Sequence, residues 1–223
     1  MAKKNNSNKK HPATILIGLI ILLGLAFAGI QVPEVFQDLL TFEETPIDKT
    51  SQGEISQSGE NPGPIENGQA TFTKEELKDN KKGWIHYGEY DELGRPTAAN
   101  ALIVPSMIGT GTSAQQDIRP PGFISGLDPN NHSRGHLIGR QLGGSGDEAK
   151  NVVTLYQNPV NTPYMTKYEN MIRKAVDNGE TVRYRVVPIY DGDIGMPIAV
   201  QMEAKGLSAH SDIDFNVTIE NKK

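Results

Sequence analysis

The sequence predicts a mixed α+β domain that follows a membrane-directed segment and a linker. Residues 13–32 form one apolar run without charges, and residues 33–70 are acidic and poor in apolar side chains. Residues 71–223 instead alternate between strand-like and helix-like patterns. These last 153 residues are enough for one hydrophobic core.

The N-terminal segment has the pattern of a membrane anchor. Residues 1–12 carry four lysines, and Glu34 and Asp38 follow the apolar run. About 20 apolar residues at ~1.5 Å each cross a bilayer, and the positive end stays inside. We expect a cytoplasmic N-terminus at 1–12, a transmembrane anchor at 13–32 and an extracytoplasmic remainder. Ala26-Phe27-Ala28 also fits a signal-peptide cleavage site, so secretion after cleavage stays open.

The segment from 33 to 70 is predicted to be a flexible linker. It holds eight acids and one base among Ser, Gln, Gly and Pro. Such a composition buries too little apolar surface to offset the entropy of ordering. We expect a disordered tether here, with the folded domain at 71–223.

Composition excludes several chemistries. The 223 residues contain no cysteine, so disulfides, a thiolate nucleophile and Cys-ligated zinc are excluded. The net charge of −5 divides into +4 for residues 1–30, −7 for 31–70 and −2 for 71–223. The segment from Arg119 to Arg185 contains nine basic and six acidic residues. The acidity therefore belongs to the linker and does not exclude a nucleic-acid substrate.

The elements of the domain follow from periodicity and turn signals. Thr73 and Glu76 form a capping box that predicts a short first helix. Residues 105–131 form a long Gly/Pro-rich passage, which inside a compact domain is usually functional. Alternation and helical spacing predict the remaining elements: strands at 84–90, 97–103, 180–190, 198–204 and 213–219, and a helix at 164–178.

Two histidines mark the centre of the domain. On a helix, the i, i+4 pair His132 and His136 would resemble a zinc-binding signature. However, Gly135 lies between them, Ser133 stands where that signature has glutamate, and the preceding turn favours an extended chain. A strand edge that presents Arg134 and His136 to a phosphodiester is the better interpretation, because neutral histidine accepts a proton at pH 7.

Downstream polar residues suit a hard cation. Asn158, Asn161 and Glu169 supply amide and carboxylate oxygens, which Mg²⁺ prefers. Arg173 follows Glu169 at i+4 on the predicted helix, a spacing that is also common in surface ion pairs.

These motifs resemble the DNA/RNA non-specific endonucleases of the ββα-metal superfamily. The family hallmark, Asp-Arg-Gly-His followed by a metal-binding Asn and a Glu, corresponds here to Ser133-Arg134-Gly135-His136, Asn161 and Glu169. The similarity covers roughly residues 84–217 and is greatest to membrane-anchored or secreted nucleases of Gram-positive bacteria, such as competence DNA-entry nucleases. It implies an α+β fold with a ββα-metal (His-Me finger) core on a central antiparallel sheet.

The resemblance also implies roles for individual residues. His136 would be the general base that activates water, and Asn161 would bind Mg²⁺ directly, with Mn²⁺ or Ca²⁺ as substitutes. Glu169 would hold a metal-bound water, and Arg173 or Arg134 would neutralise the scissile phosphate. The products would be DNA and RNA fragments with 5′-phosphates.

Some positions depart from the family pattern. Ser133 replaces the usual Asp, and Asn151 is expected to support the site from outside it. Asn158 competes with Asn161 as the metal ligand, although the interval from Asn161 to Glu169 fits the family better. On a continuous helix that interval would span about 12 Å, so we expect Pro163 to kink or start the helix.

The substrate should be bound through its phosphates. No base-reading motif is apparent, so binding should be weakly sequence-specific and salt-sensitive. We expect substrate contacts from Arg140, Arg183 and Arg185 in particular, with Arg119, Lys167 and Lys174 as further candidates. The alternative function is a membrane-tethered polynucleotide-binding protein without catalysis, which would need neither the base nor the metal.

Overall fold

A computed structural model describes residues 60–78, 82–126 and 128–223. The predicted cytoplasmic segment 1–12, the apolar segment 13–32 and the linker up to residue 59 lie outside the described residues. In the described part, no helix has the length and apolar character needed to cross a membrane.

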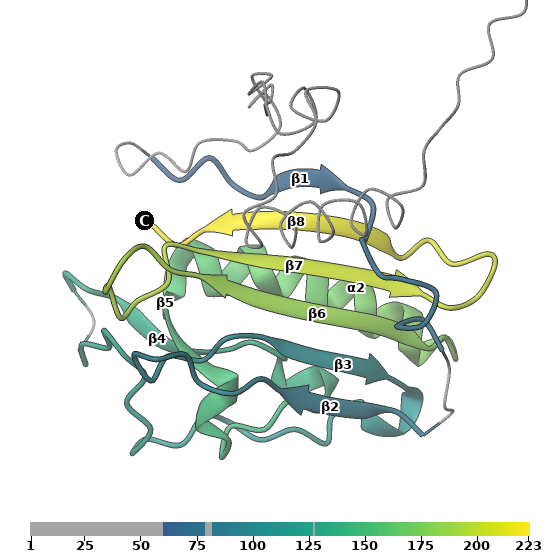
Figure 1. Cartoon of the computed structure of the whole chain (residues 1–223), viewed down its shortest axis with the longest axis horizontal. Coiled ribbons are helices and arrows are strands. Elements are labelled where there is room, and N and C mark those ends of the chain that lie inside the picture. Colours follow the sequence, from purple (N-terminus) through teal and green to yellow (C-terminus); the bar gives the residue numbers. More distant parts are fainter. Residues whose placement is uncertain (1–59, 79–81, 127) are drawn as a thin grey trace, which may run out of the picture. The chain divides into compact units, whose positions relative to one another are not determined.

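Within these residues, a six-stranded antiparallel sheet has the order β1-β8-β7-β6-β3-β2, and β4 and β5 form a separate antiparallel pair (Figure 1). The longer elements are β1 (Ile65–Gly68), β2 (Trp84–Tyr87), β3 (Ala99–Ile103), β4 (His132–His136), β5 (Val152–Tyr156), α2 (Thr166–Asp177), β6 (Val182–Ile189), β7 (Ala199–Gly206) and β8 (Asp214–Glu220). Short helical segments are η2 (Pro105–Met107), η3 (Arg140–Leu142), η4 (Ala149–Asn151) and η5 (Gln157–Met165).

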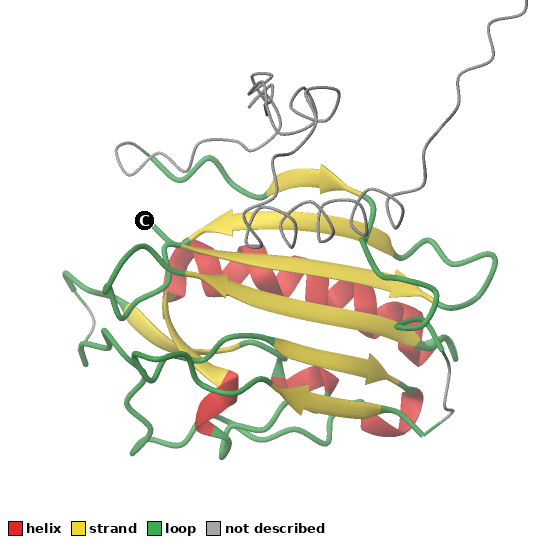
Figure 2. Cartoon of the chain, viewed as in Figure 1, coloured by secondary structure: helices red, strands yellow, loops and turns green. Residues whose placement is uncertain are grey.

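Helix α2 lies across one face of the large sheet (Figure 2). Its apolar residues Tyr168, Ile172 and Val176 recur every four positions, so they share one face of the helix, and all three are buried. They belong to the same core as Tyr184 of β6 and Met202 of β7. This packing fixes the helix that follows β4 and β5 against the sheet.

The side chains of strand β6 alternate between the two faces of the sheet. Val182, Tyr184 and Val186 point into the core that contains α2. Side chains alternate along a strand, so Arg183 and Arg185 point to the opposite face. The predicted alternation over 180–190 is therefore confirmed.

The sequence located most elements to within a few residues. The predicted strands at 84–90, 97–103, 198–204 and 213–219 appear as β2, β3, β7 and β8, and the helix at 164–178 appears as α2. The capping box also forms, since Glu76 Oε2 accepts hydrogen bonds from Thr73 N and Oγ1, each at 3.0 Å. It caps a single turn rather than the helix that we expected.

The predicted boundary between linker and domain at Ala70 is wrong. Strand β1 pairs with β8, with Ile65 opposite Thr218, and Asn61 Nδ2 donates to Glu220 O at 2.9 Å and to Lys222 O at 2.7 Å. Tyr168 Oη of α2 donates to Glu66 Oε1 at 2.7 Å. Main-chain pairing along the edge of β8 orders this polar segment, and composition alone does not reveal such pairing.

Candidate active site

The site is built on β4, which presents its polar residues on one face. A Cβ at Gly135 would lie 2.4 Å from Leu155 Cδ1, so this position faces the interior. By alternation, His132, Arg134 and His136 face the other way. Because β4 is extended, His132 and His136 are about 13 Å apart along the strand, which excludes the helical zinc pair.

The outward face of β4 is covered by the Gly/Pro-rich passage. His136 Nε2 lies 3.0 Å from Thr112 O, and Arg134 Nε donates to Ile118 O at 2.8 Å. Ile124 N donates to His132 Nδ1 at 3.2 Å. Residues 112–124 therefore run antiparallel to β4 and contact each outward side chain in turn. This explains why so long an irregular passage is ordered.

One ring nitrogen of His136 is hydrogen-bonded to the covering passage. A carbonyl oxygen only accepts hydrogen bonds, so Nε2 carries the proton that it donates to Thr112 O, and Nδ1 is the nitrogen with a free lone pair. Burial lowers the pKa of the His136 imidazole below its usual 6.5, an effect that the Thr112 bond opposes and that nearby Arg140 reinforces. The imidazole is therefore neutral at pH 7.

Arg134 is engaged by the covering passage. Besides Ile118 O, it donates from Nη2 to Gln116 O at 3.0 Å, and its guanidinium lies 4.4 Å from the centre of the Phe123 ring. In the structure, Arg134 thus holds residues 116–123 against β4.

Glu169 is a buried carboxylate next to the segment that follows β4. It is 8% exposed, and among the described residues its donors are neutral: Gln141 Nε2 at 3.5 Å and the N–H of Gly139. Burial raises the pKa of Glu169 to about 7, and these two hydrogen bonds only partly oppose it. A buried carboxylate without a cationic partner binds either a proton or a cation. Glu169 therefore fits a role in holding a metal ion, directly or through water.

Asn161 precedes α2 rather than lying on it. The irregular segment η5 has extended backbone at Asn158 and Thr162, and α2 begins at Thr166, three residues after Pro163. The expectation of an interrupted helix between Asn161 and Glu169 is thus confirmed. Asn161 Nδ2 donates to Gln157 Oε1 at 3.1 Å, so the carbonyl oxygen Oδ1 is the atom that a cation would bind. Asn158 is exposed on the same segment.

The side chains of Asn151 and Ser133 form hydrogen bonds with the main chain of neighbouring segments. Asn151 is fully buried, and its Oδ1 accepts from Ile138 N at 2.8 Å. Its Nδ2 donates to Ile138 O at 3.1 Å and to Ser145 O at 2.9 Å. It therefore ties the segment after β4 to the following loop. Ser133 Oγ donates across the hairpin to Leu155 O at 3.3 Å.

Arg173 and Arg140, two further predicted site residues, lie on different elements. Arg173 pairs with Asp177 at 3.2 Å on the partly exposed side of α2, whereas Glu169 is buried. Arg140 is exposed beside the covering passage, and its Nη1 donates to Ser113 Oγ at 3.0 Å.

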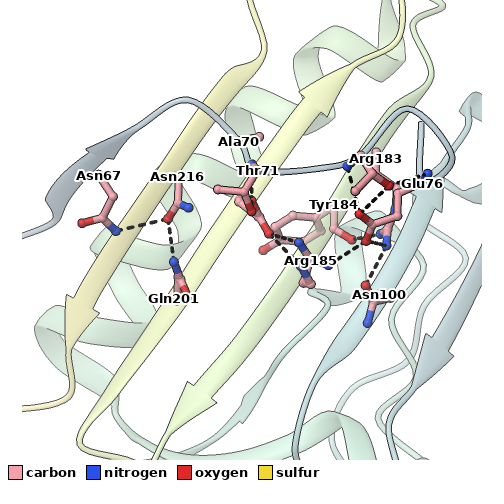
Figure 3. Close-up of polar contacts among 12 residues, drawn as sticks. Asn67, Ala70, Thr71, Glu76, Asn100, Arg183, Tyr184, Arg185, Gln201 and Asn216 are labelled. Atoms are coloured by element: carbon pink, nitrogen blue, oxygen red, sulfur yellow. Dashed lines mark hydrogen bonds and ion pairs between the residues drawn. The ribbon is translucent and has the colours of Figure 1, made fainter. Parts of the chain in front are cut away.

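The structure does not bring Arg183 and Arg185 to His136. Both point to the sheet face opposite α2, where Figure 3 shows them among acidic and polar side chains. Arg183 is 3% exposed and donates to Asn100 Oδ1 at 2.7 Å, while Arg185 pairs with Glu203 at 2.6 Å and Glu76 at 2.8 Å. Their charges are satisfied by the protein, so the predicted substrate contacts are not supported.

Two residues of the site, Thr112 and Gly139, were not predicted from the sequence. Thr112 lies in the passage that was expected to be functional, but no sequence motif around it indicates that its carbonyl oxygen binds a histidine. Gly139 lies against Glu169 across the fold, and a Cβ there would be 2.4 Å from both carboxylate oxygens. Such a contact between residues 30 positions apart leaves no local signal. Among the described residues, no three His, Asp or Glu side chains gather as a ready-made metal site.

Comparisons with known proteins agree with this fold. A family model described as DNA/RNA non-specific endonuclease matches residues 75–208. NucA from Streptococcus agalactiae with magnesium bound is similar in structure at 26% identity, with a TM-score of 0.62, over 85% of this chain and 91% of that one. The metal-free form of NucA gives 28% identity and a TM-score of 0.59, over 72% and 80%. Sda1 nuclease with bound zinc shares the fold at 19% identity and a TM-score of 0.57, over 71% and 90%.

Proposed function

Because the chain belongs to the DNA/RNA non-specific endonuclease family, we propose that it hydrolyses DNA and RNA without sequence specificity, in a magnesium-dependent reaction with His136 as general base. The observation that carries this proposal is the hydrogen bond between His136 Nε2 and Thr112 O at 3.0 Å. It leaves Nδ1 of a neutral imidazole to take the proton of the attacking water. Membership of the family makes the chain an endonuclease; the metal, the use of RNA and the residue roles are our proposals.

The residues present fit a hard cation. Asn161 Oδ1 and the Glu169 carboxylate are oxygen donors of the kind that Mg²⁺ prefers, and Glu169 is a buried carboxylate whose donors are neutral. When bound, magnesium supplies positive charge beside the phosphate and the leaving oxygen. NucA, whose structure holds magnesium, is the similar protein that supports this choice of metal.

We assign the transfer of the water proton and the binding of the substrate phosphates to side chains of this protein. His136 Nδ1 accepts a proton from water and the water oxygen bonds to phosphorus. The bond to the 3′-oxygen breaks with its electron pair on that oxygen, which takes up a proton from solvent, so the fragments carry 5′-phosphate and 3′-hydroxyl ends. Arg140 and Arg173 are the cationic side chains that we assign to phosphate contacts, because both are partly exposed. Arg134 contributes by holding the passage over β4.

We also propose that the enzyme acts outside the cytoplasm. The apolar segment 13–32 supports either a membrane anchor or a cleaved signal, and both export the remainder of the chain. N-terminal sequencing of the mature protein distinguishes the two.

Plasmid DNA and a structured RNA test the activity directly. With Mg²⁺, both should be cut to 5′-phosphorylated fragments, and EDTA should stop the reaction. Intact DNA after incubation with Mg²⁺ would leave a polynucleotide-binding protein as the remaining interpretation.

Two variants test the metal ligand. Asn161→Ala should raise the Mg²⁺ concentration needed for half-maximal rate by about tenfold or more, since ligand loss weakens binding. Asn158→Ala is the matched control and should leave that concentration unchanged. The reverse result would assign the metal to Asn158.

A further inference from the structure

The part of the covering passage that reaches His136 is packed closely against another loop. A Cβ at Gly111 would lie 2.4 Å from Gly144 O, and one at Gly146 would lie 2.1 Å from Ser113 O, so the two backbones touch. Thr112 N donates to Gly144 O at 3.1 Å. Residues 111–115 are thus held along residues 143–147 by main-chain contacts.

Asp147 ties the two loops together through its side chain. Its Oδ2 accepts a hydrogen bond from Thr112 Oγ1 at 2.8 Å, and its Oδ1 accepts one from Gln115 Nε2 at 2.6 Å. Thr112 Oγ1 in turn accepts from Gly146 N at 2.8 Å. Hydrogen bonds to a carboxylate are stronger than neutral ones, so Thr112 is fixed through both its side chain and its main chain.

The fixed residue is the one that orients the base. Thr112 presents its carbonyl oxygen to His136 Nε2 at 3.0 Å, and this bond sets both the ring orientation and the tautomer. A rotation of the Thr112 peptide would remove the acceptor. The side chain of Asp147 is exposed, so its bonds to Thr112 and Gln115 are not needed to fill the core.

We propose that Asp147 is a positioning residue for catalysis: it fixes the Thr112 carbonyl, which holds His136 with Nδ1 directed to the attacking water. The inference rests on the proposed role of His136 as general base. Asp147 touches neither the base nor, in this account, the substrate, and it acts only through residue 112.

Steady-state cleavage of DNA by the full chain tests this role. Asp147→Ala should lower kcat about tenfold while KM for DNA changes less than about twofold, which is the lower end of what loss of an orienting partner costs. The acid limb of the kcat–pH profile should move to lower pH, because a displaced Thr112 carbonyl no longer favours the protonated imidazole. Asp193→Ala removes the same charge from an exposed position in the loop between β6 and β7, and it should leave kcat and the profile unchanged.

A second pair keeps the test valid if Asp147→Ala folds poorly. Thr112→Val preserves shape but removes the hydroxyl, so it should reproduce the loss of kcat and the shift of the limb. Thr112→Ser retains the hydroxyl and should restore both toward wild type.

The outcomes separate this inference from the proposed function. If His136→Ala is inactive while Asp147→Ala and Thr112→Val keep wild-type kcat and profile, the positioning role is wrong and the base assignment stands. A loss of kcat in proportion to a loss of folded protein, with an unmoved acid limb, also overturns the role. If His136→Ala remains fully active, the proposed function itself fails.

Discussion

Replacing Gly139 by alanine should slow the enzyme strongly by displacing Glu169. The backbone at Gly139 has φ −61° and ψ 148°, which alanine adopts freely, so the change introduces no backbone strain. The new Cβ, however, would lie 2.4 Å from each carboxylate oxygen and 2.6 Å from Cδ. The perturbation is therefore confined to one methyl group against one carboxylate.

The size of the effect follows from these distances. Ordinary contacts of a Cβ begin near 3.4 Å, so the Glu169 carboxylate must withdraw by about 1 Å. A displacement of about 1 Å at a catalytic group costs about 100-fold in rate. We expect Gly139→Ala to cleave plasmid DNA about 100-fold more slowly at fixed Mg²⁺, measured as initial rates, and to need more Mg²⁺ for half-maximal rate.

A compensating change provides the control. Glu169→Asp shortens the side chain by one methylene and should itself reduce activity, but in the double variant it gives the new methyl group room. The two losses should therefore combine to less than their product, as expected for residues in contact. Gly139→Ala with a wild-type rate and an unchanged Tm would refute the placement of Glu169 beside the segment after β4.

The remaining predictions concern stability and pH. Asn221→Ala should lower the free energy of unfolding by about 3 kcal/mol in urea titrations. The Asn221 amide accepts a hydrogen bond from Tyr156 N at 3.0 Å and donates to Thr154 O at 3.0 Å and to Pro197 O at 2.8 Å. Asn170→Ala, on the exposed side of α2, should change the free energy of unfolding by less than about 0.5 kcal/mol. The lowered pKa of His136 places the acid limb of kcat below pH 6.5, and a limb well above 6.5 would contradict a neutral, buried base. Metal-free protein should lose about 3 kcal/mol of stability as pH rises from 4.5 to 7, since folded Glu169 holds its proton more tightly than the unfolded chain; urea titrations of Glu169→Gln should not show this loss.

Local signals in the sequence predicted the elements that carry the site. The turn before His132 and the glycine at 135 correctly indicated a strand, and the i, i+4 spacing of apolar residues correctly indicated α2. Periodicity works here because each pattern reflects one buried face of one element. The interruption between Asn161 and Glu169 followed from Pro163 together with the ~12 Å that a continuous helix would place between the two residues.

Contacts between distant segments were not predictable in the same way. The polar segment around Ile65 looks like linker, yet it is ordered by main-chain bonds to β8. Alternation correctly placed Arg183 and Arg185 together on one face of β6, but not the acids Glu76 and Glu203 that neutralise them. Tertiary packing decides which face of a strand contacts the substrate. The residue pattern of one strand does not reveal which face that is.

Cleavage of supercoiled plasmid by His136→Ala in Mg²⁺ tests the central claim most directly. The variant should keep the wild-type Tm within a few degrees, because His136 is a half-buried residue at the end of β4. If His136 is the general base, the variant nicks DNA at least about 100-fold more slowly than wild type, the contribution expected of such a base. A folded His136→Ala protein that cleaves at the wild-type rate would contradict this role.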